Sequence, residues 1–147
     1  MEPRIILFSP MTRSLQSAQL LSAALNVPCT VEFDLHEWVP DMSFSWTTLG
    51  EVMANFADLE TCGGEWPPGE TRAWEPLSAV RKRVLAVFAR HADYGRILVV
   101  CHGEVVRSLA GVKELGFAEL VPYPYPASPS PSGAPDLSYQ RSPQEPR

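Results

Sequence analysis

Residues 96–110 read RILVVCHGEVVRSLA, and this stretch decides the fold. Its residues 97–101 are all apolar or sulfur-bearing, and they run directly into His102 and Gly103. An unbroken run of this kind is typical of a strand in a parallel sheet that helices cover on both faces. His102 would then follow the carboxyl end of a strand, where ligands bind in open α/β sheets. The alternative is a buried histidine that caps a turn.

The segment after this strand, residues 104–110, is predicted to be a helix. The free N–H groups of its first turn could face an anion. Gly103, just before it, would let the backbone and a ligand approach each other closely, because glycine carries no side chain.

The chain begins with a second strand-to-helix unit. Residues 5–8 form a short apolar run that stops at Ser9 and Pro10, and we expect Ser9 to be the N-cap and Pro10 the first helical position. Apolar residues at helical spacing predict the buried face of this helix: Met11, Leu15, Ala18, Leu21 and Leu25. Arg13, in the first turn, could bind a phosphate with its forked guanidinium. The alternative is a solvated surface arginine.

Residues 30–33, TVEF, alternate between polar and apolar side chains, as in a strand. They lead into a cluster of acids with His36 and Trp38. Partial burial beside Trp38 could raise the pKa of Glu37, as a general acid working near neutral pH requires. The alternative for Glu37 is an exposed loop residue. The three histidines fall at unrelated spacings, so no metal site is predicted.

The middle of the chain contains two predicted amphipathic helices. A capping box at Thr48 and Glu51 starts the first, which places Met53 and Phe56 in the core and ends at Gly63 and Gly64. The second runs from about residue 75 with four basic residues mostly on its solvent side: Arg81, Lys82, Arg83 and Arg90. Residues 65–71 between the helices are predicted to be a loop, and residues 118–121 a possible edge strand.

Composition limits the remaining possibilities. The 147 residues suffice for one domain, assigned to 1–123, and 124–147 form a tail predicted to be disordered because it is rich in proline and serine. A net charge of −5 argues against nucleic acid as a partner. Three scattered cysteines indicate a reducing compartment, and no apolar run is long enough to cross a membrane. We therefore expect a cytoplasmic protein with no membrane partner.

Four segments resemble the motifs of one family, in that family's order. Residues 9–18, SPMTRSLQSA, are similar to the SPLxRAxQTA element of the histidine phosphatase superfamily, the phosphoglycerate-mutase-like proteins. Residues 99–107, VVCHGEVVR, resemble its second histidine motif, commonly VxHGGxIR. Residues 35–37 match the place of the acidic proton donor, and residues 69–71 look like the GES loop. The resemblance covers residues 4–123.

The resemblance implies a three-layer α/β/α sandwich and phosphoryl transfer at a histidine. One histidine would attack the phosphoryl group, and arginines with a second histidine would hold its oxygens. Glu37 and His102 would be catalytic, Glu37 as the acid, and Arg13, His102 and Gly103 would bind phosphate. Neither a metal nor another cofactor is expected. The implied partner is a phosphorylated small molecule or a phosphoprotein, and the oligomeric state stays open.

The sequence departs from the family pattern at its start. The family's first motif, an RHG that supplies the nucleophilic histidine, has no counterpart before Ser9. The strand carrying that motif is central in the family, so we expect the remaining sheet to have a gap or an exposed edge. The chain is therefore expected to be a truncated or diverged member with little or no phosphomonoesterase or mutase activity. The alternative is a non-catalytic remnant that binds a phospho-ligand or a protein.

Overall fold

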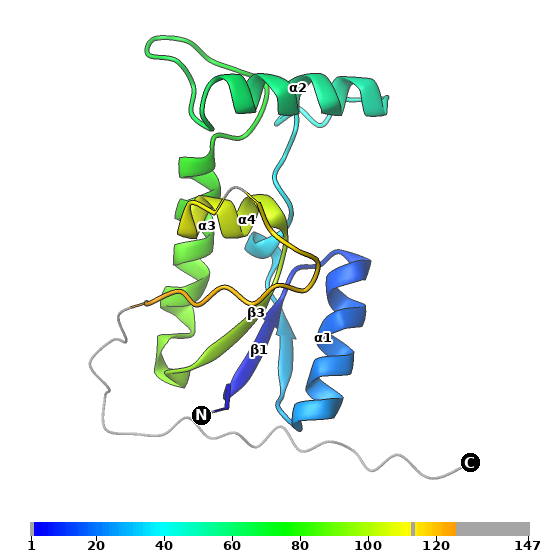
Figure 1. The fold of residues 1–147 in the computed structure, drawn as a ribbon, viewed down its shortest axis with the longest axis vertical. Helices are drawn as coiled ribbons and strands as arrows, with labels where there is room; N and C mark the ends of the chain where they lie inside the picture. The colour runs from blue at the N-terminus through cyan, green and yellow to red at the C-terminus, as the bar shows by residue number, and fades with distance from the viewer. Residues whose placement is uncertain (1, 113, 126–147) are drawn as a thin grey trace.

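The computed structural model describes residues 2–112 and 114–125 (Figure 1). Its helices and strands follow in this order: β1 (Ile5–Phe8), α1 (Thr12–Leu25), β2 (Cys29–Val31), α2 (Leu49–Thr61), α3 (Leu77–Arg90), β3 (Ile97–Val100) and α4 (Gly103–Ala110). Two short 3₁₀ turns, η1 (Phe33–Leu35) and η2 (Ala92–Tyr94), follow β2 and α3. Strands thus alternate with helices, as the sequence predicts for an α/β fold.

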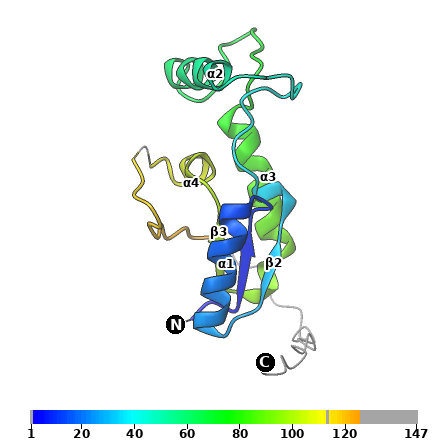
Figure 2. The same ribbon diagram turned by 90° about the vertical axis from the view of Figure 1, so that its right-hand side faces the viewer.

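The described strands form one parallel sheet in the order β2-β1-β3. Helix α1 lies on one side of this sheet and α3 on the other, which makes three layers (Figures 1 and 2). The predicted α/β/α sandwich is confirmed. β3 lies at one end of the described sheet and has β1 as its neighbour, so the expected exposed edge is present at the strand that ends before His102.

Each face of the sheet has its own apolar cluster, because side chains alternate along a strand. Ile6 and Phe8 point toward α1 and pack with Ala18 and Val27. On the other face, residues of β1 pack with α3 and with the tryptophans of the connecting segments: Ile5, Leu7, Leu35, Trp38, Trp74, Val80, Val84 and Val87. The second cluster is the larger, so α3 is the main support of the sheet.

Helix α1 buries only part of the face predicted for it: Ala18 is buried and Leu15 packs against the same cluster, but Met11 is exposed. Its buried positions are the small residues Ser14, Ala18 and Ser22, whereas Leu21 and Leu25 are exposed. Small side chains let α1 pack closely against β1 and β3, and the leucines fall outside that stripe. The helix also begins two residues later than predicted. Met11 is its N-cap, so Ser9 does not cap it.

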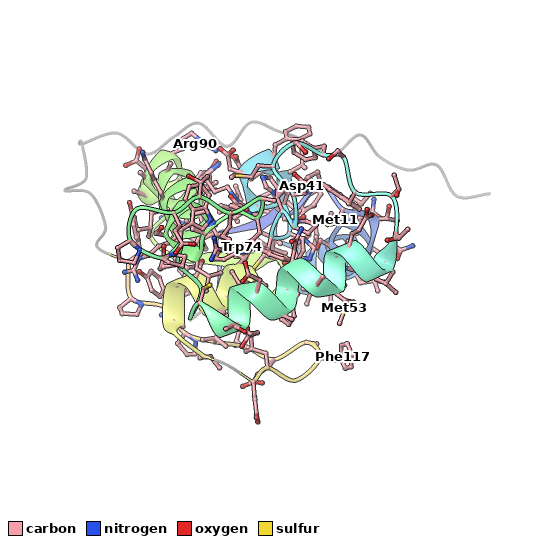
Figure 3. The ribbon with its side chains drawn as sticks, turned by 90° about the horizontal axis from the view of Figure 1, so that it is seen from above. Met11, Asp41, Met53, Trp74, Arg90 and Phe117 are labelled. Carbon is pink, nitrogen blue, oxygen red and sulfur yellow. The ribbon has the colours of Figure 1, made fainter. Side chains whose placement is uncertain are left out.

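Helix α2 lies beyond the end of the sheet, away from the three layers (Figure 1). The predicted capping box is confirmed: Thr48 accepts a hydrogen bond from the N–H of Glu51, whose carboxylate accepts one from the N–H of Thr48. Leu59 is its buried residue, and Phe56 packs on the core. The prediction that Met53 is core is wrong, because Met53 is 56% exposed and points outward from α2 (Figure 3).

Residues 118–121 form no strand, contrary to the prediction. The chain turns at Phe117 and Ala118, and Ala118 has a left-handed backbone with φ of 57°, which interrupts an extended segment. The ring of Phe117 is fully exposed (Figure 3). Beyond this turn, Tyr123 and Tyr125 pack their rings against Phe88. Most of the predicted tail, residues 126–147, lies outside the described residues.

None of the helices in the described ranges has the length and apolar character that a membrane crossing requires.

Candidate functional site

The candidate site lies where β1 and β3 end side by side. Ser9 follows β1 and His102 follows β3, and because the strands are parallel neighbours, both residues reach the same end of the sheet. Both are buried, and His102 Nε2 lies 2.7 Å from Ser9 Oγ. Ser9 Oγ also accepts a hydrogen bond of 3.3 Å from the N–H of Met11. Ser9, which the sequence predicted as the cap of α1, therefore contacts His102 instead.

Arg13 determines the protonation of His102. Its Nη2 lies 2.9 Å from His102 Nδ1. A guanidinium can only donate hydrogen bonds, so Nδ1 must accept. His102 is therefore the neutral tautomer with hydrogen on Nε2, and Nε2–H donates to Ser9 Oγ. Both ring nitrogens have partners, which fixes the orientation of the imidazole.

Burial and positive neighbours keep His102 neutral. Burial and, to a smaller extent, charge repulsion from Arg13, His36 and Arg83 together lower its pKa to about 4. Glu37 Oε2 lies 3.5 Å from His102 Nδ1. We do not regard this contact as an ion pair, because Nδ1 already accepts from Arg13 and the ring is uncharged near neutral pH. In this site, the neutral imidazole of His102 therefore accepts a hydrogen bond from the positively charged guanidinium of Arg13.

Glu37 lies on the other side of Arg13. Its Oε2 is 3.4 Å from Arg13 Nη2, and its Oε1 accepts a 3.0 Å hydrogen bond from the N–H of Trp38. Burial raises the pKa of Glu37, although Trp38, Arg13 and Arg83 each oppose the shift. Desolvation outweighs both cations, because Arg13 is 59% exposed and screened by water, and Arg83 binds the Glu75 carboxylate and the backbone carbonyl of Glu37. Glu37 therefore stays protonated to a higher pH than an ordinary glutamate, as a proton donor requires.

The segment that carries Glu37 is held by Arg83 of α3, a residue that the sequence analysis placed mostly on the solvent side. Arg83 is only 13% exposed in its side chain. It donates to the carbonyl oxygens of Asp34 at 2.5 Å and His36 at 2.9 Å, and more weakly to that of Glu37 at 3.4 Å. These bonds fix the backbone from η1 to Glu37.

Glu75 completes this arrangement, which we call the Arg83–Glu75 clamp. Arg83 binds both oxygens of the Glu75 carboxylate, Nε to Oε1 at 2.8 Å and Nη2 to Oε2 at 3.1 Å. The backbone of Glu75 accepts from Trp38 Nε1 at 2.7 Å, and its carboxylate accepts from the N–H of Val39 at 3.3 Å. The chain is thus held before Glu37 by Arg83 and after Glu37 by Glu75. No local sequence pattern marks this clamp, because its members are 8 to 49 residues apart.

Gly103 is the first residue of α4 and is exposed, with open space where a side chain would begin. Its predicted role in phosphate binding is geometrically possible, since the helix begins directly after His102. The next residue, Glu104, brings a second partly buried carboxyl group. Burial raises its pKa, and repulsion from Glu37 and Glu60 adds to the shift. Arg107 pairs with Glu60 and Glu104 and so links α4 to α2.

The other candidate residues of the sequence analysis lie apart from the cluster or turn away from it. His36 Nδ1 donates to the carbonyl oxygen of Glu37 at 2.7 Å. His91 pairs with Glu32 at 2.5 Å, near the end of α3. In the loop at residues 69–71, Glu70 pairs with Arg72, which in turn binds Asp58 of α2. Within residues 2–112 and 114–125, no group of three or more histidine, cysteine or acidic side chains is placed to hold a metal.

The sequence of residues 1–120 matches the family model of the histidine phosphatase superfamily (branch 1). That span is most of the 147-residue chain. The chain belongs to the histidine phosphatase superfamily. No curated protein sequence matches this chain significantly.

Solved structures agree with this histidine phosphatase fold. A mycobacterial glucosyl-3-phosphoglycerate phosphatase superposes with a TM-score of 0.57 at 18% identity, over 76% of this chain and 57% of its own. Mycobacterial hydrolase 2 gives a TM-score of 0.53 at 20% identity, over 74% and 51%. Mycobacterial hydrolase 1 gives 0.53 at 18%, over 74% and 57%. The matched part of this chain thus spans little more than half of each neighbour.

Proposed function

We propose that Ser9, Arg13, Glu37 and His102 bind the phosphoryl group of a phosphomonoester, and that this chain alone turns it over slowly or not at all. The observation that carries the proposal is the contact of 2.9 Å between Arg13 Nη2 and a buried, neutral His102. Arg13 is more than half exposed, so an incoming anion can reach its guanidinium without unfolding the site. A guanidinium is well suited to phosphate, because it offers paired donors in one plane.

Binding would couple to proton uptake at His102. With no ligand, Nδ1 accepts from Arg13. When a phosphoryl oxygen replaces that contact, Nδ1 must become a donor; if Nε2–H keeps its hydrogen bond to Ser9 Oγ, both ring nitrogens then carry hydrogen, so His102 takes up a proton and its pKa rises toward or above the ordinary value. Arg13 and protonated His102 would then both donate to the phosphoryl oxygens. The pKa of Glu37 is raised, and a protonated Glu37 would not repel the anion. It could also donate its proton to the leaving oxygen.

Low turnover follows from the roles already assigned to the histidines. Covalent catalysis needs an imidazole in line with the leaving oxygen. His102 is occupied at both ring nitrogens, and in the proposed complex it holds the phosphoryl group. His36 and His91 are bonded to other groups. Binding and electrostatic stabilisation would then give only residual acceleration.

The proposed ligand is a phosphorylated small molecule. Among the solved neighbours, one acts on glucosyl-3-phosphoglycerate, according to its name. A phosphoprotein is the alternative ligand of the same chemistry. We place the protein in the cytoplasm, because all three of its cysteines are unpaired thiols, as in reducing compartments.

The test is a titration with inorganic phosphate and with an aryl phosphate, followed by NMR of the His102 ring. We expect the ring signals to move at millimolar ligand and the His102 pKa to rise with saturation. Turnover of the aryl phosphate should stay near that of a His102→Ala control. Unmoved ring signals would contradict binding. Robust turnover, lost in the control and with phosphate trapped on a histidine, would contradict the proposed lack of catalysis.

A further inference from the structure

The carboxyl group of Glu104 lies close to the proposed phosphate site but takes no part in holding the phosphoryl group. Glu104 is the second residue of α4, which begins directly after His102 and lies between the sheet and α2 (Figures 1 and 2). Its side chain is 18% exposed, so a ligand at the end of the sheet can reach part of it. Gly103 leaves open space between His102 and Glu104. A small group of a bound ligand can therefore lie beside the Glu104 carboxyl group.

Helix α2 places Glu104 near the segment of the proposed proton donor. Phe56 and Glu60 are four residues apart in α2, so their side chains lie on one face of that helix. The ring of Trp38, the residue after the donor, contacts Phe56 with the ring centroids 5.8 Å apart. Glu60 binds Arg107 of α4, and Arg107 also lies 3.4 Å from Glu104. The donor segment and the Glu104 side of α4 therefore meet the same face of α2.

The ion pairs of α4 leave one negative charge uncompensated at this place. Arg107 is shared by two carboxylates, and it contacts Glu60 more closely than Glu104. Burial raises the pKa of Glu104, the charge of Arg107 opposes this shift, and repulsion from Glu37 and Glu60 adds to it. The repulsion from Glu37 agrees with the placement of both carboxyl groups on one side of the site. An ionised Glu104 is therefore only partly neutralised by its own cation.

Two of the arginines around this site already have carboxylate partners within the part of the chain that the structure describes. Arg83 binds Glu75 and backbone carbonyls, and Arg107 binds Glu60. Arg13 is the residue proposed to hold the phosphoryl group. A second anionic group on the ligand would therefore have to break an existing ion pair to gain a cation, and this lowers its affinity.

We propose that Glu104 selects the leaving group of the phosphomonoester: it favours one with an ammonium or hydroxyl group near the ester oxygen and disfavours one with a carboxylate there. The inference rests on the proposed function, in which Arg13 and His102 hold the phosphoryl group and Glu37 faces the leaving oxygen. The leaving group would then extend past Glu37, over Gly103, toward Glu104. An ammonium or hydroxyl group can donate to the Glu104 carboxylate, whereas a carboxylate repels it.

Three phosphate esters of similar size test the proposal on the full chain: 2-aminoethyl phosphate, 2-hydroxyethyl phosphate and phosphoglycolate. Each is titrated at about pH 8, to keep Glu104 ionised despite its raised pKa, and followed by NMR of the His102 ring. We expect 2-aminoethyl phosphate to bind about tenfold more tightly than phosphoglycolate, with 2-hydroxyethyl phosphate between them. Equal affinities, or tighter binding of phosphoglycolate, would overturn the inference and leave phosphate binding intact. Ring signals that none of the three esters moves would overturn the proposed function itself.

Two matched variants separate the charge of Glu104 from the overall charge of the protein. Glu104→Gln removes the charge at nearly the same size. Glu2→Gln removes an equal charge from an exposed residue before β1, at the end of the sheet opposite to the site. The ratio of the affinities for 2-aminoethyl phosphate and phosphoglycolate should fall to about twofold in Glu104→Gln and stay at about tenfold in Glu2→Gln.

An unchanged ratio in Glu104→Gln would overturn the inference, because the preference would then come from another group. An equal fall in both variants would also overturn it, since the net charge of the chain would then be the cause. If Glu104→Gln fails to fold, the comparison of the three esters on the parent protein decides.

Discussion

Two arginines near Glu37 differ sharply in how the protein uses them. Arg83 in the clamp is 13% exposed and makes five hydrogen bonds, two to Glu75 and three to backbone carbonyls. Arg13 is 59% exposed and has two side-chain contacts, to His102 and Glu37. Arg83 therefore has its hydrogen-bonding capacity filled by the protein. Arg13 retains free donors at the surface of the site.

The difference in exposure suggests different roles for the two arginines: one positions Glu37, and the other can contact a ligand. A buried guanidinium whose donors are satisfied cannot turn to a ligand without leaving Glu75 and three carbonyls unpaired in the interior. An exposed guanidinium with weak contacts can exchange them for a phosphoryl group at small cost. Arg83 holds the backbone on either side of Glu37, and Arg13 is the residue that we propose to bind an anion. The following predictions test this division.

The largest effect is expected for Arg83→Met. Removing the guanidinium leaves the Glu75 carboxylate buried without its partner, which should lower the free energy of unfolding by about 3 to 5 kcal/mol. Urea denaturation measures this loss. The double variant Arg83→Met with Glu75→Met should recover much of the stability but not the position of Glu37. A single variant as stable as the parent would show that the clamp is not structural.

The next effect concerns pH. The pKa of His102 is about 4 in the folded state, below its ordinary value of 6.5, so the unfolded chain binds a proton that the folded chain excludes. This contribution to stability is complete above about pH 6.5 and is lost as the pH falls toward 4, on the order of 3 kcal/mol in total. Urea unfolding of the parent and of His102→Gln at several pH values measures it. The two proteins should diverge across this window; parallel curves would contradict a buried neutral histidine.

The smallest effect on stability is expected for Arg13→Met, about 1 kcal/mol, because Arg13 is 59% exposed and its contact with Glu37 is long, so that the main loss is the 2.9 Å hydrogen bond to His102. Phosphate affinity should nevertheless fall about tenfold or more, since a charged hydrogen bond is lost. The pKa of His102 should rise in the free protein, because Arg13 now lowers it. Isothermal titration and NMR provide these readouts. An Arg13 variant that loses stability but not phosphate affinity would reverse the roles of the two arginines.

Much of the local structure could be predicted from the sequence. The run at residues 97–101 predicted β3 within one residue, and the Thr48 and Glu51 pair predicted the start of α2. These signals are local: a strand with both faces covered must be apolar throughout, and a helix must satisfy its first N–H groups. Arg13, Glu37 and His102 were selected by motif, and the structure places them within 3.5 Å of one another. Their function stays a prediction.

Other interpretations failed because they depended on distant partners. Ser9 followed by proline matches a helix cap, yet Ser9 binds His102, 93 residues away. Residues 118–121 have the composition of an edge strand, but the left-handed Ala118 turns the chain there. Met53 fits an amphipathic pattern, but α2 lies beyond the sheet and has no layer to cover with that side.

The sequence by itself determined the alternation of strands and helices, the apolar identity of β3 and the residue types available at its end. Only the tertiary structure decided that Ser9 and Arg13 both contact His102, that Arg83 is buried against Glu75, and that β3 lies at an edge. The reason is physical. Periodicity and capping act between residues a few positions apart, whereas burial, pKa and hydrogen-bond partners depend on which distant segments the packed sheet brings together.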